Sequence, residues 1–161
     1  MKIQYASDLH LEFPANRKFL KQNPLRSVGD VLVLAGDIIP FTLLESLGDL
    51  IDMLADRFNT VYWLPGNHEY YYFDIDKKPS PLFEKIRDNV YLVNDQVVEC
   101  GDIQLVFSIL WSNISPESQC LGKAGIPDFS VIKSGIVPKI SVMARMRPVS
   151  TLKRRCSTPS S

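Results

Sequence analysis

The stretch Leu64-Pro65-Gly66-Asn67-His68-Glu69 follows an apolar run, residues 60–64, that is typical of a buried strand. Its proline and glycine break regular structure, so the chain turns where the strand ends. We therefore expect Asn67 and His68 at the carboxyl end of a strand, which is where open α/β sheets build their binding sites. An asparagine offers a neutral oxygen ligand, and an imidazole offers a nitrogen ligand or a proton donor. The chain has one other histidine, His10.

Two earlier stretches end in the same way. Residues 2–7 alternate as a strand does and lead into Asp8-Leu9-His10, and residues 31–34 form a run suited to a strand covered on both faces, followed by Gly36-Asp37. Successive clusters lie about 30 residues apart, which is the length of one strand–crossover–strand unit. Neighbouring parallel strands would therefore bring the three clusters side by side.

The segments between and after these strands complete an α/β pattern. Apolar residues recur every three or four positions over 42–58, which predicts an amphipathic helix with Thr42 as its cap and Glu45 completing a capping box. Short helices are expected over 16–22 and 79–87, the second with proline in its first turn. Strands are expected over 90–93, 97–100 and 103–110, the last two as a hairpin. The order predicts parallel strands joined by right-handed crossovers.

The three clusters together have the chemistry of a metal site. Asp8 and His10 are two residues apart, so they project to the same side of an extended chain, and both are suitable ligands for first-row metals. Asp37 lies between the outer clusters, where one carboxylate can bridge two ions. Two ions ~3.5–4 Å apart can hold a phosphate and generate a hydroxide that attacks phosphorus in line. Each cluster alone would fit a turn, a cap or a hydrogen-bonded loop histidine, but their joint position favours a phosphoesterase site.

The motifs Asp8-x-His10, Gly36-Asp37 and Gly66-Asn67-His68-Glu69 resemble, in this order, the first three motifs of the calcineurin-like metallophosphoesterase superfamily. The amino-terminal run MKIQYASDLHLEF is similar to that of bacterial members, and the resemblance covers roughly residues 1–115. It implies an α/β fold that forms the βαβαβ half of an α/β/β/α sandwich, incomplete at the carboxyl end.

The same resemblance implies a dinuclear site for two divalent ions, often manganese, iron or zinc. By position, Asp8 and His10 would bind the first ion, Asp37 would bridge the pair and Asn67 would bind the second ion. The implied substrate is a phosphomonoester or phosphodiester, either a small molecule or a nucleotide.

The catalytic residues that the resemblance implies are His68 and Asn67. His68 would donate a proton to the leaving group or stabilise the transition state, and would not be a ligand. Glu69 would orient His68 or the loop.

The sequence departs from that superfamily after His68. Members carry further histidines downstream, typically an isolated one and then Gly-His-x-His, but no histidine follows His68 here. Beyond about residue 115 the periodicity weakens, and residues 129–161 carry seven basic and no acidic side chains. We expect a phosphoesterase-like domain over 1–115 and an atypical Pro-rich basic tail over 116–161, poorly ordered or loosely attached, as in a truncated or frame-shifted gene product.

The missing histidines leave a second hypothesis open. The chain could be a catalytically impaired fragment that acts as a binding or oligomerising module. A third hypothesis, that the basic tail binds nucleic acid, is less favoured because no aromatic residues are interleaved with its charges.

Composition places the chain among cytoplasmic globular proteins. Net charge is zero and 45% of residues are hydrophobic. The three cysteines form no CxxC pair, which favours a reducing compartment. The amino terminus has no signal-peptide apolar region, and no apolar run reaches the ~20 residues that span a bilayer.

Two aromatic stretches border the predicted site. Residues 70–73 form a run of four aromatics, for which packing against the loop is favoured over a substrate wall. Trp111-Ser112-Asn113 ends the last predicted strand, and a buried aromatic is favoured over a site residue there.

Overall fold

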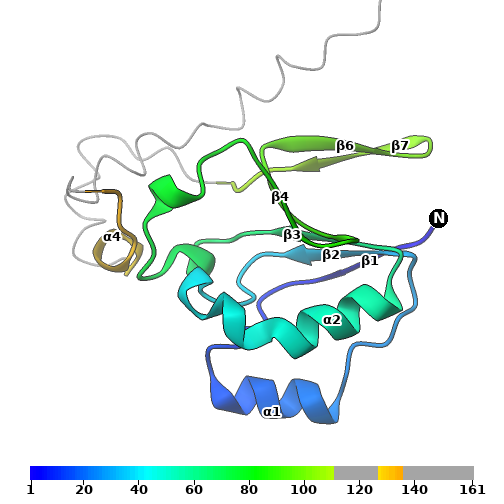
Figure 1. Cartoon of the computed structure of the whole chain (residues 1–161), viewed down its shortest axis with the longest axis horizontal. Coiled ribbons are helices and arrows are strands. Elements are labelled where there is room, and N and C mark those ends of the chain that lie inside the picture. The colour runs from blue at the N-terminus through cyan, green and yellow to red at the C-terminus, as the bar shows by residue number, and fades with distance from the viewer. Residues whose placement is uncertain (111–126, 136–161) are drawn as a thin grey trace, which may run out of the picture.

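The computed structural model describes residues 1–110 and 127–135 (Figure 1). The strands are β1 (Ile3–Ala6), β2 (Val31–Ala35), β3 (Thr60–Leu64), β4 (Leu82–Arg87), β5 (Val90–Asn94), β6 (Gln96–Cys100) and β7 (Ile103–Phe107). The α-helices are α1 (Pro14–Gln22), α2 (Gly48–Arg57) and α4 (Asp128–Val131), and short 3₁₀ helices cover η1 (Phe41–Leu47), η2 (His68–Tyr70) and η3 (Ile75–Lys77).

A five-stranded sheet in the order β1-β2-β3-β5-β4 forms the centre of the molecule. Its first four strands run parallel, and β4 pairs antiparallel with β5 at one edge. The register sets Ala6 beside Leu34 and Leu34 beside Trp63, so β1, β2 and β3 end level with one another. The predicted α/β fold and its first three strands are confirmed, and three consecutive loops leave the sheet at the same edge.

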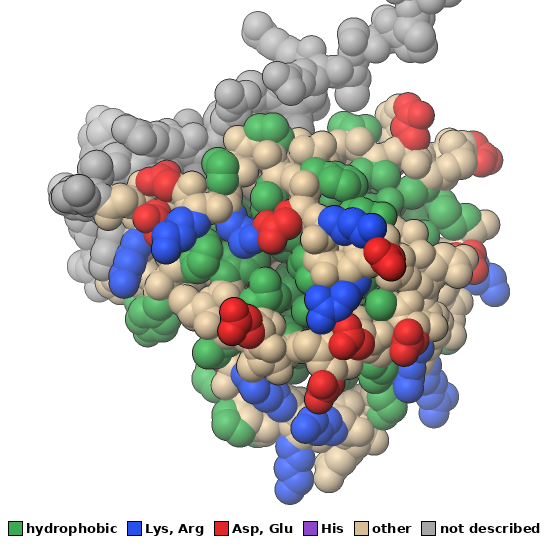
Figure 2. Space-filling model, in the orientation of Figure 1, with side chains coloured by type: hydrophobic (Ala, Val, Ile, Leu, Met, Phe, Trp, Pro, Cys, Tyr) green, Lys and Arg blue, Asp and Glu red, His purple; other side chains and the backbone are tan. Residues whose placement is uncertain are grey.

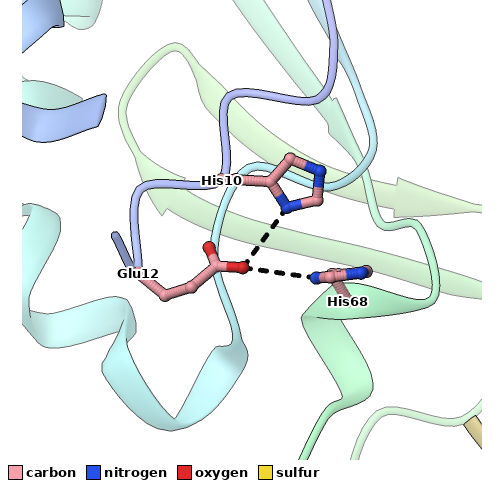
Figure 3. Close-up of side chains that lie close together, drawn as sticks. All are labelled: His10, Glu12 and His68. Atoms are coloured by element: carbon pink, nitrogen blue, oxygen red, sulfur yellow. Dashed lines mark hydrogen bonds and ion pairs between the residues drawn. The ribbon is translucent and has the colours of Figure 1, made fainter. Parts of the chain in front are cut away.

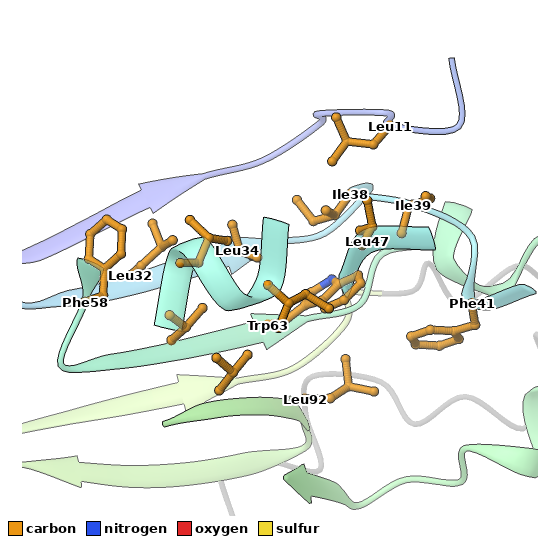
Figure 4. Packing of buried hydrophobic residues seen from close by; sticks show 14 of the residues in the cluster. Leu11, Leu32, Leu34, Ile38, Ile39, Phe41, Leu47, Phe58, Trp63 and Leu92 are labelled. Carbon is orange, nitrogen blue, oxygen red and sulfur yellow. The ribbon is translucent and has the colours of Figure 1, made fainter. Parts of the chain in front are cut away.

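Both faces of the sheet are covered, which explains why its inner strands are almost wholly apolar. On one face lie α1 and α2 (Figure 1), and here α2 buries Ile51 and Leu54 against the sheet. Leu32 and Trp63 point into the same core (Figure 4), to which Val61 also belongs, and all three are at most 1% exposed.

The predicted hairpin of β6 and β7 covers the other face (Figure 1). There Val31, Tyr62 and Val93 pack against Phe107 in a second, smaller core. Burial in this core and the neighbouring Cys100 thiol raise the pKa of Tyr62 to about 12.

One helix prediction is wrong, and another is confirmed only in part. Residues 79–87 contain the strand β4, in which half-buried and exposed residues alternate with the two-residue period of a sheet edge. The predicted helix over 42–58 is divided into η1 and α2, and the capping box over Thr42 is absent because η1 begins one residue earlier, after Pro40, without a side-chain cap.

Part of the predicted tail packs on the domain. Ile132 is 3% exposed in the main core, and the backbone N–H of Tyr72 donates to the Val131 carbonyl at 2.9 Å. Residues 127–135 are thus held against the loop that follows β3. Trp111-Ser112-Asn113 and the rest of the tail lie outside the described residues, and within the described part no helix has the length and apolar character to cross a membrane.

Candidate metal centre

Backbone hydrogen bonds join the loops that follow β1, β2 and β3. The N–H of Asp8 donates to the Gly36 carbonyl at 3.0 Å, and that of His10 donates to the Asp37 carbonyl at 3.0 Å. The N–H of His68 donates to Asp37 Oδ1 at 3.1 Å, which ties the third loop to the second. The three predicted clusters therefore lie side by side.

Asp8, His10 and Asp37 form one group of possible ligands. Each offers a ligand atom, and the three atoms lie within 4.8 Å of one another. All three residues have a left-handed backbone, with φ of 55° at Asp8, 46° at His10 and 56° at Asp37. Non-glycine residues rarely adopt this conformation, and its clustering is typical of functional sites.

Two glycines allow the second and third loops to meet. A Cβ on Gly36 would lie 3.1 Å from the Gly66 backbone, and a Cβ on Gly66 would overlap the Asp37 carboxylate. Gly36 also has a φ of +88°, which glycine adopts without strain. The close approach of Asp37 to the third loop thus depends on both residues lacking side chains.

Glu12 also lies in the site, although its local sequence does not single it out as a ligand. Its Oε1 lies 3.3 Å from His10 Nδ1 and 3.2 Å from His68 Nδ1 (Figure 3). His10, Glu12 and His68 form a second group whose ligand atoms lie within 4.8 Å of one another. The alternation Asp8, His10, Glu12 was the available signal, because it extends the same-side spacing by one more step.

The His68 ring is packed between aromatic neighbours. It stacks on Tyr71 with ring centroids 4.2 Å apart, and its edge-on contact with His10 has a centroid distance of 4.5 Å. Tyr70 and Phe73 instead pack with Phe41, so the packing prediction for residues 70–73 holds for these two. Tyr71 differs, because it lines the site.

Asn67 is oriented by a residue from the far end of the described chain. Its Nδ2 donates to Asp128 Oδ1 at 2.9 Å, and the Tyr71 hydroxyl donates to the same oxygen at 2.6 Å. Burial and the Asp128 carboxylate raise the pKa of Tyr71, so the phenol keeps the proton that it donates. These contacts leave Asn67 Oδ1 as the amide atom suited to an ion. No local pattern marks Asp128, because it lies 61 residues from its partner.

Glu69 holds the second and third loops together from below the site. It is fully buried, and its two oxygens accept from the N–H groups of Asp37, Ile38 and Gly66 and from the indole of Trp63. Burial raises the pKa of Glu69, and these four donors oppose that effect by stabilising the carboxylate. Of the two roles expected for it, the contacts support orientation of the loop.

The side chains present fit divalent cations. Three carboxylates, Asp8, Glu12 and Asp37, lie beside two imidazoles, which is a donor set suited to first-row metals. Glu12 Oε2 is buried, and it has no hydrogen-bond partner among the described residues. A buried anionic oxygen in a cluster of carboxylates favours a bound cation.

Comparison with known proteins agrees with this geometry. Residues 1–130 match the Metallophos model, described as calcineurin-like phosphoesterase. The chain belongs to the calcineurin-like phosphoesterase family. Members of this family are metal-dependent hydrolases of phosphate esters, so the family implies divalent metal ions and phosphate-ester substrates.

Two curated proteins are similar in sequence to this chain. An uncharacterized protein, L509, of Acanthamoeba polyphaga mimivirus is 32% identical over 146 residues, covering 81% of this chain and 51% of L509. The [acyl-carrier-protein] phosphodiesterase PptH of Mycobacterium tuberculosis is 35% identical over 88 residues, covering 55% of this chain and 26% of PptH. The chain thus spans about half the length, or less, of the curated relatives that it matches.

The crystal structure of the phosphopantetheinyl hydrolase PptH from Mycobacterium tuberculosis has the same fold. The two structures superpose with a TM-score of 0.58 at 19% identity, over 96% of this chain and 62% of PptH. At this identity the likeness supports the fold alone.

Proposed function

We propose that this chain is a metal-dependent phosphoesterase that hydrolyses a phosphomonoester or a phosphodiester through a dinuclear metal site. The observation that carries the proposal is the meeting of the loops after β1, β2 and β3, linked by the 3.0 Å bond from His10 N to the Asp37 carbonyl and the 3.1 Å bond from His68 N to Asp37 Oδ1. Family membership supports the reaction class.

In this proposal Asp8 and His10 would hold a first ion, Asp37 would be shared by both ions and Asn67 Oδ1 would hold the second. The contacts of Asn67 Nδ2 with Asp128 support that choice of amide atom. When bound, two divalent ions such as manganese, iron or zinc polarise the phosphate and activate a water molecule.

His68 is proposed to act on the leaving group. Its ring is held on one face by Tyr71 and at Nδ1 by Glu12, so Nε2 is the nitrogen available to a substrate. A proton at Nε2 can pass to the departing oxygen, while the contact between Nδ1 and Glu12 holds the ring in place.

The experiment is a hydrolysis assay on the purified full chain with added manganese and two aryl esters, a phosphomonoester and a phosphodiester. The relationship to PptH adds a third substrate, a phosphopantetheine-bearing acyl carrier protein. Asp37→Ala is expected to abolish ion binding, because it removes the bridging ligand. His68→Ala is expected to slow turnover and leave ion binding in place.

The matched control for these variants is Glu45→Ala, which removes an exposed carboxylate in η1. It should change neither quantity. If the wild-type chain hydrolyses none of the three substrates, the catalytic proposal is wrong for this polypeptide.

A second candidate function is a binding or oligomerising module with impaired catalysis. It is favoured by the absence of any histidine after His68 in the sequence. Calorimetric titration with manganese separates the two, since this module would bind at most one ion weakly, whereas two tightly bound ions would exclude it. A second chain could also complete the ligand set, and dimerisation that depends on metal would support that arrangement.

Nucleic acid is a less favoured partner. On the face of the molecule in Figure 2, acidic and basic side chains are interspersed, so that face presents no patch of one sign to a phosphate backbone. If the basic tail did bind nucleic acid, deleting residues 129–161 would eliminate a steeply salt-dependent affinity, and an unchanged affinity would dismiss this function.

A further inference from the structure

Glu12 contacts both histidines of the chain through one oxygen atom. Oε1 lies 3.3 Å from Nδ1 of His10 and 3.2 Å from Nδ1 of His68 (Figure 3). The Glu12 side chain is 16% exposed, and each histidine side chain is 25% exposed. The contact is therefore largely shielded from water, and its geometry matters for the chemistry of both rings.

The segment that carries Glu12 is anchored on both sides. Leu11 is 2% exposed in the main core, and its N–H donates to the Ile38 carbonyl at 2.8 Å. Asn16 Nδ2 donates to the carbonyls of Leu9 and His10 at 3.0 and 3.1 Å. The backbone that carries Glu12 is therefore held in place, so only the side chain has to be ordered for the two contacts to form.

The two contacts restrict where the ring protons lie. A carboxylate only accepts hydrogen bonds, and a neutral imidazole carries one N–H and one lone pair. A lone pair on Nδ1 would face the lone pairs of Oε1 across about 3.2 Å, which is repulsive. Even a protonated carboxyl group has one proton and could satisfy only one ring. Both contacts are attractive when each ring is protonated at Nδ1.

We propose that Glu12 is a positioning residue that sets His10 and His68 in the same Nδ1–H tautomer, directing both Nε2 atoms away from itself and into the metal and substrate region. This inference rests on the proposed function for the role of the two Nε2 atoms. His10 then presents its Nε2 lone pair to the ion that it would share with Asp8 and Asp37. His68 presents Nε2 to the leaving group, and it can donate a proton there when Nε2 is protonated in addition to Nδ1.

One acceptor shared between two rings also fixes their relative placement. The edge-on contact of the rings, with centroids 4.5 Å apart and planes at 73°, follows from both N–H groups pointing at the same oxygen. Removal of a residue that orients a metal ligand in this way typically lowers metal affinity or activity 10–100-fold.

A different arrangement would place an ion among His10 Nδ1, Glu12 and His68 Nδ1, with all three as direct ligands. Both nitrogens would then have to lose their protons on metal binding. The tautomer arrangement requires the opposite, with Nδ1 protonated before and after the metal is added. Ring-nitrogen spectroscopy distinguishes these two states directly.

The test is a ¹⁵N–¹H spectrum of the histidine rings of the full chain, recorded without metal at a pH well above the ordinary imidazole value of ~6.5. The chain contains two histidines, so His68→Gln leaves a single ring and assigns both. The expected result is a protonated Nδ1 and an unprotonated Nε2 in each ring. Zinc should then shift Nε2 of His10 and leave both Nδ1–H signals in place. An unprotonated Nδ1 in either ring, before or after zinc, overturns the proposal.

Variants give a second readout. Glu12→Ala should remove the Nδ1–H preference of both rings and weaken zinc binding ~10–100-fold, whereas Glu45→Ala should preserve both. Unchanged ring signals in Glu12→Ala would also overturn the proposal. The spectra require no turnover, so a chain without hydrolytic activity can still show the predicted tautomers, and failure of the proposed function is distinguishable from failure of this inference.

Discussion

The substitution Glu69→Gln tests how the loops of the site are held. In the native structure Oε1 of Glu69 accepts from Ile38 N at 2.7 Å and from Trp63 Nε1 at 3.1 Å. Oε2 accepts from Asp37 N at 2.9 Å and from Gly66 N at 2.7 Å. A glutamine would place an NH₂ group where one of these two oxygens lies. In either orientation of the amide, the two N–H groups that donate to that oxygen would then face a donor and lose their acceptor.

The magnitude follows from counting the orphaned groups. A buried donor that loses its acceptor costs ~1–3 kcal/mol, so two of them cost on the order of 2–6 kcal/mol. This is a large fraction of the ~5–15 kcal/mol by which a typical domain is stable. Because two of the four donors belong to Asp37 and Gly66, ion affinity should fall together with the free energy of unfolding.

The assay is urea denaturation followed by tryptophan fluorescence and circular dichroism, with the free energy of unfolding taken by linear extrapolation. Glu45→Gln is the control, because it makes the same chemical change on an exposed side chain and should stay within ~0.5 kcal/mol of the wild type. A loss below ~1 kcal/mol in Glu69→Gln would refute the reasoning, since it would mean that the four contacts are not made by an ionised, acceptor-only group.

Three other changes probe separate parts of the molecule. Gly66→Ala should weaken manganese binding in calorimetry, because the added Cβ would lie 3.0 Å from Asp37 N and overlap its carboxylate. In the control Gly48→Ala the new Cβ meets nothing within 4 Å, so manganese binding should be unchanged and α2 should be stabilised by up to ~1 kcal/mol. Equal manganese affinities of the two variants would contradict this. Asp128→Ala should lower manganese affinity ~10-fold or more by releasing the amide that it orients, and unchanged affinity would remove that role. The pKa of Tyr62 is about 12 in the folded state and ~10 in the unfolded state, so its contribution to the free energy of unfolding is present below pH ~10 and is lost as the pH rises through about 12. Urea unfolding should show this loss, on the order of 2 kcal/mol, and Tyr62→Phe should abolish it.

The central sheet was predictable because its strands are buried on both faces. Runs such as 31–34 and 60–64 are apolar throughout, and the regular spacing of the polar residues after them shows that they end at one edge. Topology then brings Asp8, Asp37 and Asn67 into neighbouring loops without any information on side-chain packing.

The helix prediction over 79–87 was wrong because its sequence signal is shared by a helix start and by an edge strand. A proline-rich start at residues 79–81 fits a helix amino terminus, but it also fits the entry to an edge strand, and the two-residue alternation of 82–87 was the better guide. Glu12 and Asp128 were missed for a different reason. Their roles depend on contacts with His68 and Asn67, 56 and 61 residues away. The spacing of Glu12 from His10 marks it only as a candidate, and no local pattern marks Asp128.

At Asp8, His10 and Asp37 the left-handed backbone lowers the stability of the fold, but the side chains there are the ones that can bind a metal ion. Glycine would relax the main chain there by ~1–2 kcal/mol per residue, but it would remove a carboxylate or an imidazole. If the protein did not need to bind cations, replacing these three residues with glycine would increase the stability of its fold. The residues that this chain carries are the ones that selection for robustness alone would discard.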